Sequence, residues 1–144
     1  APEEAIILRL GVVVGQQAEI TYGLGAMAVS QTRPSLDGYL PWIHEDDWVG
    51  LVQHLLTMEQ PPATVVAVAP QLPRYSEMIN ALAPGLGHRK IPVPAALLRL
   101  GLNVIRMEPG MLLGSTRARS TVLEDIGYTF RYPTIAEAAD AVKI

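Results

Sequence analysis

Two short segments that are apolar on both faces constrain the fold of this chain most strongly. Residues 5–14 are almost continuously apolar and rich in β-branched side chains, and residues 64–69 have the same character. Such strands are typical of a parallel sheet covered by helices on each side, because neither face of the strand meets water. Residues 45–58 lie between them and carry apolar residues at helical spacing. The order strand, helix, strand predicts a βαβ-like unit.

Two strands are too few for a stable sheet, since sheets usually contain about four to six. We therefore expect an α/β sheet that is incomplete without upstream residues, a partner chain or a swapped copy. The alternative is that residues 16–40, where Gly, Ser, Thr and Pro interrupt every period, supply the missing strands. Because the sequence begins with Ala1 and not with Met, we expect further residues upstream.

The chain after Pro70 is predicted to be mostly helical, because its apolar residues recur at helical spacing between Pro and Gly breaks. One short half-buried strand is predicted from the alternation of Tyr128 and Phe130 with polar residues. The predicted helices cover residues 75–82, 95–107, 120–126 and 134–142.

The composition excludes several classes of function. The net charge of −3, with Lys and Arg scattered along the chain, offers no surface for nucleic acid. No apolar run is long enough to cross a membrane, and we predict no membrane partner. The absence of cysteine excludes disulfides, thiol nucleophiles and cysteine-ligated zinc, and is consistent with a cytoplasmic protein.

A dinucleotide-binding motif is present only in part. Residues 23–28 match the pattern G-x-G-x-x-A, but the preceding residues 18–22 do not form a buried strand, since they contain Glu19. The acidic partner expected about 20 residues later would be Asp37 or Glu45, neither at a convincing strand end. A glycine turn in a loop is the better interpretation, and we predict no cofactor-binding residue in this chain.

The cluster His44-Glu45-Asp46-Asp47 is a weak candidate for a metal site. Adjacent residues on a helix point about 100° apart, so consecutive ligands do not converge on one ion. His54 and His88 lie elsewhere in the sequence. We predict no metal site and assign the acidic residues to the negatively charged start of the helix.

Arg117 and Arg119 lie in a Ser/Thr-rich stretch before a predicted helix. Hydroxyl groups and guanidinium groups together can bind a phosphate. The alternative is two solvated arginines that pair with Glu124 or Asp125.

Several motifs spread over nearly the whole chain resemble one family. They are R-x-G-x-V-x-G (Arg9, Gly11, Val13, Gly15), W-I-H-x-x-D (Trp42, Ile43, His44, Asp47), the strand end Ala69-Pro70, P-x-P (Pro92, Pro94), L-x-x-x-R (Leu113–Arg117) and G-Y-T-F-R-Y-P (Gly127–Pro133). The chain thereby resembles the C-terminal half of the nucleoside-diphosphate-sugar-epimerase-like branch of the extended short-chain dehydrogenases/reductases. Some members of this branch carry the label "cell division inhibitor". The departures lie mainly in residues 16–40, where the family has more glycines.

The resemblance implies that residues 1–70 form late strands and a helix of a Rossmann-like sheet. It also implies that residues 71–144 form a mostly helical substrate-side subdomain. In this family the N-terminal half binds NAD or NADP, so we expect the cofactor in the parent protein and none on this chain alone. The expected partners are the missing N-terminal half, or a second copy, and a nucleotide-sugar-like small molecule.

The superfamily uses a Tyr-x-x-x-Lys pair as its base, and none of the five tyrosines here has lysine four positions later. We predict no catalytic residue in this chain, and a substrate-binding part of an NAD(P)-dependent epimerase or reductase. The substrate-binding residues implied by the resemblance are Arg117, His44 and Trp42, although Trp42 is equally well explained as a core residue. The alternative function is a non-enzymatic protein-interaction module that acts through an exposed apolar face.

Overall fold

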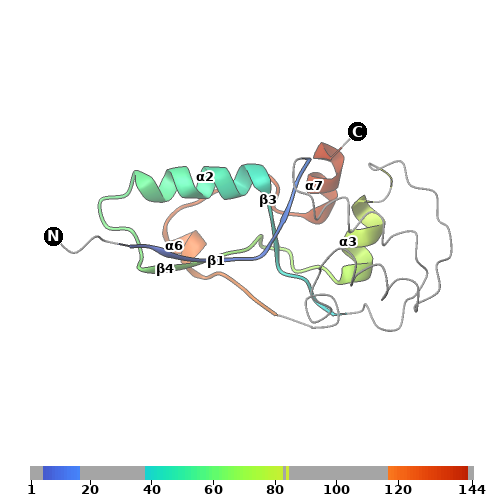
Figure 1. The fold of residues 1–144 in the computed structure, drawn as a ribbon, viewed down its shortest axis with the longest axis horizontal. Helices are drawn as coiled ribbons and strands as arrows, with labels where there is room; N and C mark the ends of the chain where they lie inside the picture. The colour runs from blue at the N-terminus through green and yellow to red at the C-terminus, as the bar shows by residue number, and fades with distance from the viewer. Residues whose placement is uncertain (1–4, 17–37, 83, 85–116, 143–144) are drawn as a thin grey trace, which may run out of the picture.

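The computed structural model describes residues 5–16, 38–82, 84 and 117–142. Its elements are short and belong to a mixed α/β fold (Figure 1). In chain order they are β1 (Ile7–Leu10), β2 (Val12–Val14), β3 (Trp42–His44), α2 (Glu45–Leu56), β4 (Thr64–Ala67), α3 (Tyr75–Leu82), α6 (Val122–Asp125) and α7 (Ile135–Ala141). No helix within these ranges is long and apolar enough to span a bilayer.

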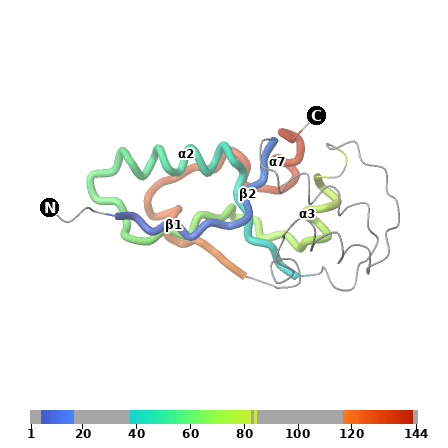
Figure 2. Tube along the Cα trace, in the orientation of Figure 1, coloured from blue at the N-terminus to red at the C-terminus, as the bar shows by residue number. Residues whose placement is uncertain are grey.

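The strand predicted over residues 5–14 is divided at Gly11 into β1 and β2, which pair with different neighbours (Figure 2). β1 is parallel to β4 and β2 is parallel to β3. Gly11 donates its N–H to the Ala67 carbonyl, and Val12 donates to Pro41. A Cβ atom at Gly11 would lie 2.9 Å from the Pro41 backbone, so glycine permits this crossover between two partners. Strand β3 was not predicted, because three residues are too few to show a period.

One face of the β1–β4 pair is covered by the described residues, whereas the opposite face is open. Val65 and Ala67 on the covered face are completely buried. On the opposite face Ile7 is 59% exposed, and its neighbours Arg9 and Thr64 are exposed too. The sequence predicts helices over both faces, and the described part of the chain covers one.

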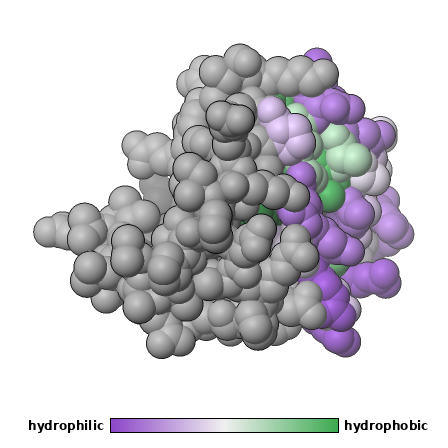
Figure 3. Space-filling view, turned by 90° about the vertical axis from the view of Figure 1, so that its right-hand side faces the viewer, coloured by the Kyte–Doolittle hydropathy of each residue, from purple (hydrophilic) through white to green (hydrophobic). Residues whose placement is uncertain are grey.

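In the described part of the chain the hydrophobic core forms two clusters. Each cluster contains residues from before and after Pro70. In one cluster Trp42 and Leu40 pack with α3 and α7, and in the other α2 packs with Val65 and with Leu123 of α6. The helices α3, α6 and α7, which follow residue 70, therefore pack directly on the strands. Viewed from the right-hand side of Figure 1, the visible described surface is mostly hydrophilic, with a small apolar patch in its upper part (Figure 3).

A buried carboxylate joins the start of α2 to the C-terminal segment. Asp47 is 1% exposed. Its carboxylate accepts hydrogen bonds from the Tyr128 hydroxyl at 3.0 Å and from the backbone N–H groups of Arg131 at 2.7 Å and Tyr132 at 2.9 Å. The side chain that caps α2 belongs to His44, whose Nδ1 accepts from the Asp46 N–H at 3.1 Å. The acidic residues Glu45, Asp46 and Asp47 lie in the first turn of α2, as predicted. The sequence did not predict that the Asp47 carboxylate also bonds to residues 128–132.

The same contacts explain why the strand predicted at residues 128–131 is absent. These residues form no ladder with another described strand, because the N–H of Arg131 bonds to Asp47. The Tyr128 hydroxyl reaches the helix beside Gly50, where a Cβ atom would lie only 2.9 Å from it. Glycine within a helix costs about 1 kcal/mol relative to alanine, and here it leaves room for that hydroxyl.

The helix predicted at residues 134–142 is confirmed as α7, and its start is well capped. Thr134 and Glu137 form a reciprocal capping box. Gln71 adds a second link, since its side chain accepts from the Ile135 N–H at 2.7 Å while its carbonyl accepts from the Trp42 indole at 2.9 Å. The helix predicted at residues 95–107 and the glycine motif at residues 23–28 lie outside the described residues.

We expect Asp47→Ala to lower the free energy of unfolding by about 3 kcal/mol, because it leaves the N–H groups of Arg131 and Tyr132 without their acceptor. The Tyr128 hydroxyl keeps the backbone carbonyl of residue 47 as its acceptor. Chemical denaturation measures this loss. Asp46→Ala is the matched control, since the exposed Asp46 carboxylate lies 3.6 Å from the Arg131 guanidinium and 3.9 Å from the His44 Nδ1. Loss of such an exposed carboxylate should change stability by less than about 1 kcal/mol. Equal losses in the two variants would contradict the structural role of Asp47.

Candidate functional site

A groove of about 610 Å³ lies beyond the carboxyl end of β4. Ligands of open α/β sheets bind beyond the carboxyl ends of strands, and binding pockets commonly have this size. The groove combines one cation, one acid and several hydroxyl groups with an apolar floor. Its lining residues are Val68, Ala69, Pro70, Arg119, Ser120, Thr121, Leu123, Glu124, Tyr128, Thr129, Phe130 and Pro133.

One hydroxyl in this groove has no hydrogen-bond partner among the described residues. The Ser120 Oγ is buried, although the rest of the residue is partly exposed. A buried hydroxyl without a partner is costly, and such groups gather at functional sites.

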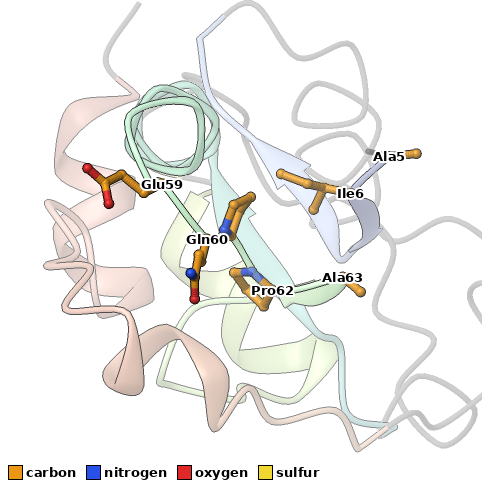
Figure 4. Close-up of a pocket in the computed structure, with 7 residues that line it drawn as sticks. Ala5, Ile6, Glu59, Gln60, Pro62 and Ala63 are labelled. Atoms are coloured by element: carbon orange, nitrogen blue, oxygen red, sulfur yellow. The ribbon is translucent and has the colours of Figure 1, made fainter. Parts of the chain in front are cut away.

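A second, smaller cavity of about 330 Å³ lies at the opposite end of the strands (Figure 4). Ala5 and Ile6 precede β1 there, and Pro62 and Ala63 precede β4. Among the described residues that line it, Glu59 alone carries a charge. Its place at the amino ends of the strands and its sparse polar groups make it the weaker candidate.

The structure places Trp42 and His44 in the interior. Trp42 is 0% exposed and donates its indole N–H to Gln71. His44 is 3% exposed, caps α2 and packs on the Tyr132 ring at 4.1 Å between centroids. Burial lowers the pKa of His44, while the nearby charges of Asp46, Glu45 and Asp47 oppose this shift. Because Nδ1 accepts the Asp46 N–H, the neutral ring carries its proton on Nε2.

Arg117 lies on the surface, in contact with an aromatic ring. Its guanidinium carbon is 4.6 Å from the centroid of the Tyr39 ring, and the Arg74 guanidinium is 4.9 Å from the same centroid. In the described residues no ion pair joins Arg117 to Glu124 or Asp125, the partners that the alternative interpretation requires. No direct contact between Arg117 and His44 or Trp42 is described, so a shared substrate site of these three residues stays a prediction.

The Tyr128 hydroxyl lies 3.0 Å from the Asp47 carboxylate, yet it is unsuited to act as a base. Burial, the charge of Asp47 and the hydrogen bond to Asp47 all raise the pKa of its hydroxyl. A catalytic tyrosine needs a lowered pKa so that the phenolate forms near neutral pH. Tyr128 is thus a hydrogen-bond donor to Asp47. Within the described residues no group of His, Asp and Glu side chains could hold a metal ion.

Comparison with known proteins shows which proteins this chain is similar to. Residues 93–142 match the family described as "Domain of unknown function (DUF1731)". The human protein "Epimerase family protein SDR39U1" is 28% identical over 143 residues, which cover 92% of this chain and 46% of the human protein. The chain is thus similar to part of an epimerase-family protein. It spans about half the length of the relative that it matches.

Solved structures support the Rossmann-like fold that the sequence predicts. The crystal structure of human SDR39U1 (isoform 2) with NADPH matches with a TM-score of 0.73 at 23% identity, and covers 95% of this chain and 47% of that one. The nucleoside-diphosphate sugar epimerase from Corynebacterium glutamicum matches with a TM-score of 0.67 at 22% identity, and covers 94% of this chain and 25% of that one. Both matches extend over almost all of this chain.

Sequence reasoning missed Tyr39, Arg74 and Ser120. Tyr39 and Arg74 are brought together by an antiparallel bridge between segments that show no periodic pattern. The Ser120 hydroxyl stands out only once the groove around it is known. A signal in the sequence existed for Arg117 alone, through its place in the L-x-x-x-R motif.

The lowered pKa of His44 predicts a pH dependence of stability. Because the unfolded state binds a proton below its pKa of 6.5 while the buried ring resists protonation, stability falls as pH decreases through and below this value. His44→Asn retains a good helix cap and does not titrate there. We expect the wild type to lose more of its melting temperature than His44→Asn between about pH 7.5 and about pH 5.5. Parallel losses would contradict this assignment.

We expect Ser120→Ala to raise the free energy of unfolding by about 1 kcal/mol, because it removes a buried hydroxyl without a partner. Thermal unfolding measures the gain. Thr121→Ala is the control, since Thr121 is exposed and its side chain does not cap α6. A loss of stability in Ser120→Ala would show that the hydroxyl is satisfied in the native protein.

Proposed function

We propose that this chain is the substrate-binding part of an NAD(P)-dependent epimerase or reductase that acts on a nucleotide-sugar-like molecule. The cofactor motif and the Tyr-x-x-x-Lys pair would then belong to a separate, cofactor-binding half. The open face of the β1–β4 pair is the observation that carries this proposal, since a parallel sheet is normally covered on both faces. Ile7 on this face is an apolar side chain that the described residues leave exposed.

The charge and shape of the groove beyond β4 support a substrate role for this half. Arg119 and Glu124 offer groups of both signs, and Thr129 offers a hydroxyl group that suits a polyhydroxylated ligand. Phe130 supplies an apolar surface on which a sugar ring can pack.

Among the residues implied by the resemblance, Arg117 is the one whose exposure allows direct contact with substrate. A guanidinium binds a diphosphate through paired hydrogen bonds. The burial of His44 and Trp42 favours a positioning role in this proposal. His44 holds the start of α2, and Trp42 holds Gln71 and through it α7.

Calorimetric titration with NADP and NADPH tests the division of labour. We expect no micromolar binding by the 144-residue chain, and micromolar binding once the cofactor-binding half is present. A glycine-rich motif followed by Tyr-x-x-x-Lys in upstream coding sequence would identify that half. Micromolar binding of NADPH by the chain alone would contradict the proposal.

A non-enzymatic interaction module is the second candidate, and one observation favours it. Val49 and Leu56 are exposed apolar residues seven positions apart on α2, and therefore lie on one helical face. A complex with another protein that forms without any nucleotide, together with failure of the reconstituted protein to bind NADPH, would support this candidate over the enzyme.

A further inference from the structure

The open face of the β1–β4 pair carries one cation that has no ion-pair partner in the described part of the chain. Strand alternation and the parallel register place Ile7 and Arg9 of β1 beside Thr64 and Val66 of β4 on this face. Ile7, Arg9 and Thr64 are exposed, and Val66 is partly buried. Among the described residues no carboxylate lies at ion-pair distance from the Arg9 guanidinium. The open face therefore combines apolar side chains with one unpaired positive charge.

The exposed surface continues around the outer edge of β1. Within the described residues β1 is paired with β4 alone, which occupies one of its two edges. Leu10 lies on the same face as the buried Val65 and Ala67, yet it is 44% exposed. Apolar side chains on both faces of β1 thus reach solvent. A cover for this region would contact the open face and the outer edge of the strand together.

The charge on the open face disfavours a second copy of the chain as its cover. Its four outward residues, Ile7, Arg9, Thr64 and Val66, include one cation and no acid. Two copies that packed this face against itself around a twofold axis would bring two Arg9 side chains toward each other, and like charges repel. Apolar groups alone are also a poor cover, because a charge removed from water needs a partner. The cover must therefore supply a carboxylate of its own.

The size of the face indicates what kind of cover fits it. Two strands of four residues each give a surface about 13 Å long and about 10 Å wide. A stable interface between independent proteins buries about 800 Å² on each partner, which is several times this area. The face is thus suited to be one part of a larger contact, such as the contact between two halves of a single sheet.

We propose that the open face of the β1–β4 pair is an interface for the cofactor-binding half, and that this half places a carboxylate against the Arg9 guanidinium and apolar side chains over Ile7 and Val66. The identity of the partner rests on the proposed function above, whereas the chemistry of the surface rests on the residues of this face. Arg9 gives the interface its specificity, because a cover without an acid would leave a buried charge unpaired.

The absence of cysteine allows this surface to be tested by thiol labelling. Ile7→Cys and Val49→Cys each introduce a single thiol at positions of similar exposure, 59% and 53%. Val49 is the matched control, because it lies on α2 and outside the open face. With the cofactor-binding half at about ten times its Kd, alkylation of Ile7→Cys should slow about tenfold, because only the unbound chain exposes the thiol. Alkylation of Val49→Cys should not change.

Exchanges at Arg9 test the carboxylate of the partner. Titration calorimetry should show that Arg9→Glu binds the cofactor-binding half about tenfold more weakly or worse, because two carboxylates then face each other. Arg9→Lys keeps the positive charge and should lose less affinity. Arg131→Glu is the control and should bind normally, since it makes the same change in net charge at a side chain that is 72% exposed and lies outside the open face. Thermal unfolding shows whether each variant is folded.

Unchanged alkylation of Ile7→Cys in a reconstituted protein that binds NADPH would overturn the interface and leave the proposed function intact. Protection of Ile7→Cys by self-association of the chain would overturn the choice of partner. Equal affinities of Arg9→Glu and Arg131→Glu would overturn the carboxylate and leave Arg9 as a charge that protects an exposed strand from aggregation. Failure of the proposed function has a different signature, because the added polypeptide would then protect Ile7→Cys while the reconstituted protein failed to bind NADPH.

Discussion

The buried carboxylate of Asp47 is the interaction on which the rest of the described structure depends. Asp47 lies in the first turn of α2. Its carboxylate oxygens accept hydrogen bonds from donors that are more than eighty residues away in the sequence. A carboxylate removed from water is stable only if its oxygens are satisfied. Residues 128–132 must therefore take one conformation, which explains why they form no strand. The tyrosine hydroxyl and the two N–H groups gain in return a charged acceptor, the stronger kind of hydrogen bond.

Further contacts hold the part of the C-terminal segment that follows the bonds to Asp47. Tyr132 packs against the His44 ring that caps α2, and Pro133 leads into the capped start of α7. Gln71 ties that start to Trp42 in strand β3. The motifs W-I-H-x-x-D and G-Y-T-F-R-Y-P, which suggest a family from the sequence, thus meet in space as one hydrogen-bonded unit. In the described structure these residues connect strand β3 with helices α2 and α7. Their side chains take part in packing more than in contact with solvent.

The elements with a strong period could be predicted from sequence, and the long-range contacts could not. Helix α2 and helix α7 follow from apolar spacing and capping residues, and the apolar runs correctly indicate parallel strands. The division at Gly11 was missed because the run looks continuous, and only the approach of Pro41 shows why glycine stands there. The sequence predicts that Asp47 lies at the helix start, but it does not predict the bonds that Asp47 makes. The neighbouring residues do not distinguish a carboxylate that caps a helix from one that accepts a hydrogen bond from the N–H of residue 131. Arg117 could be predicted as a site residue from its motif. Its contact with Tyr39 could not be predicted, because the bridge between Tyr39 and Arg74 joins segments that show no periodic pattern.

The open sheet face and the ordered frame together explain how half of such a fold can be prepared for ligand binding. Trp42 and Leu51 are completely buried in the two core clusters of the described residues. The groove beyond β4 stands on segments that these two cores hold. Parallel strands direct their carboxyl ends to one edge of a sheet, and a ligand bound there contacts whatever covers the open face as well. In the proposed function cofactor and substrate are bound by different halves and meet at that edge, because strand direction places both beside it.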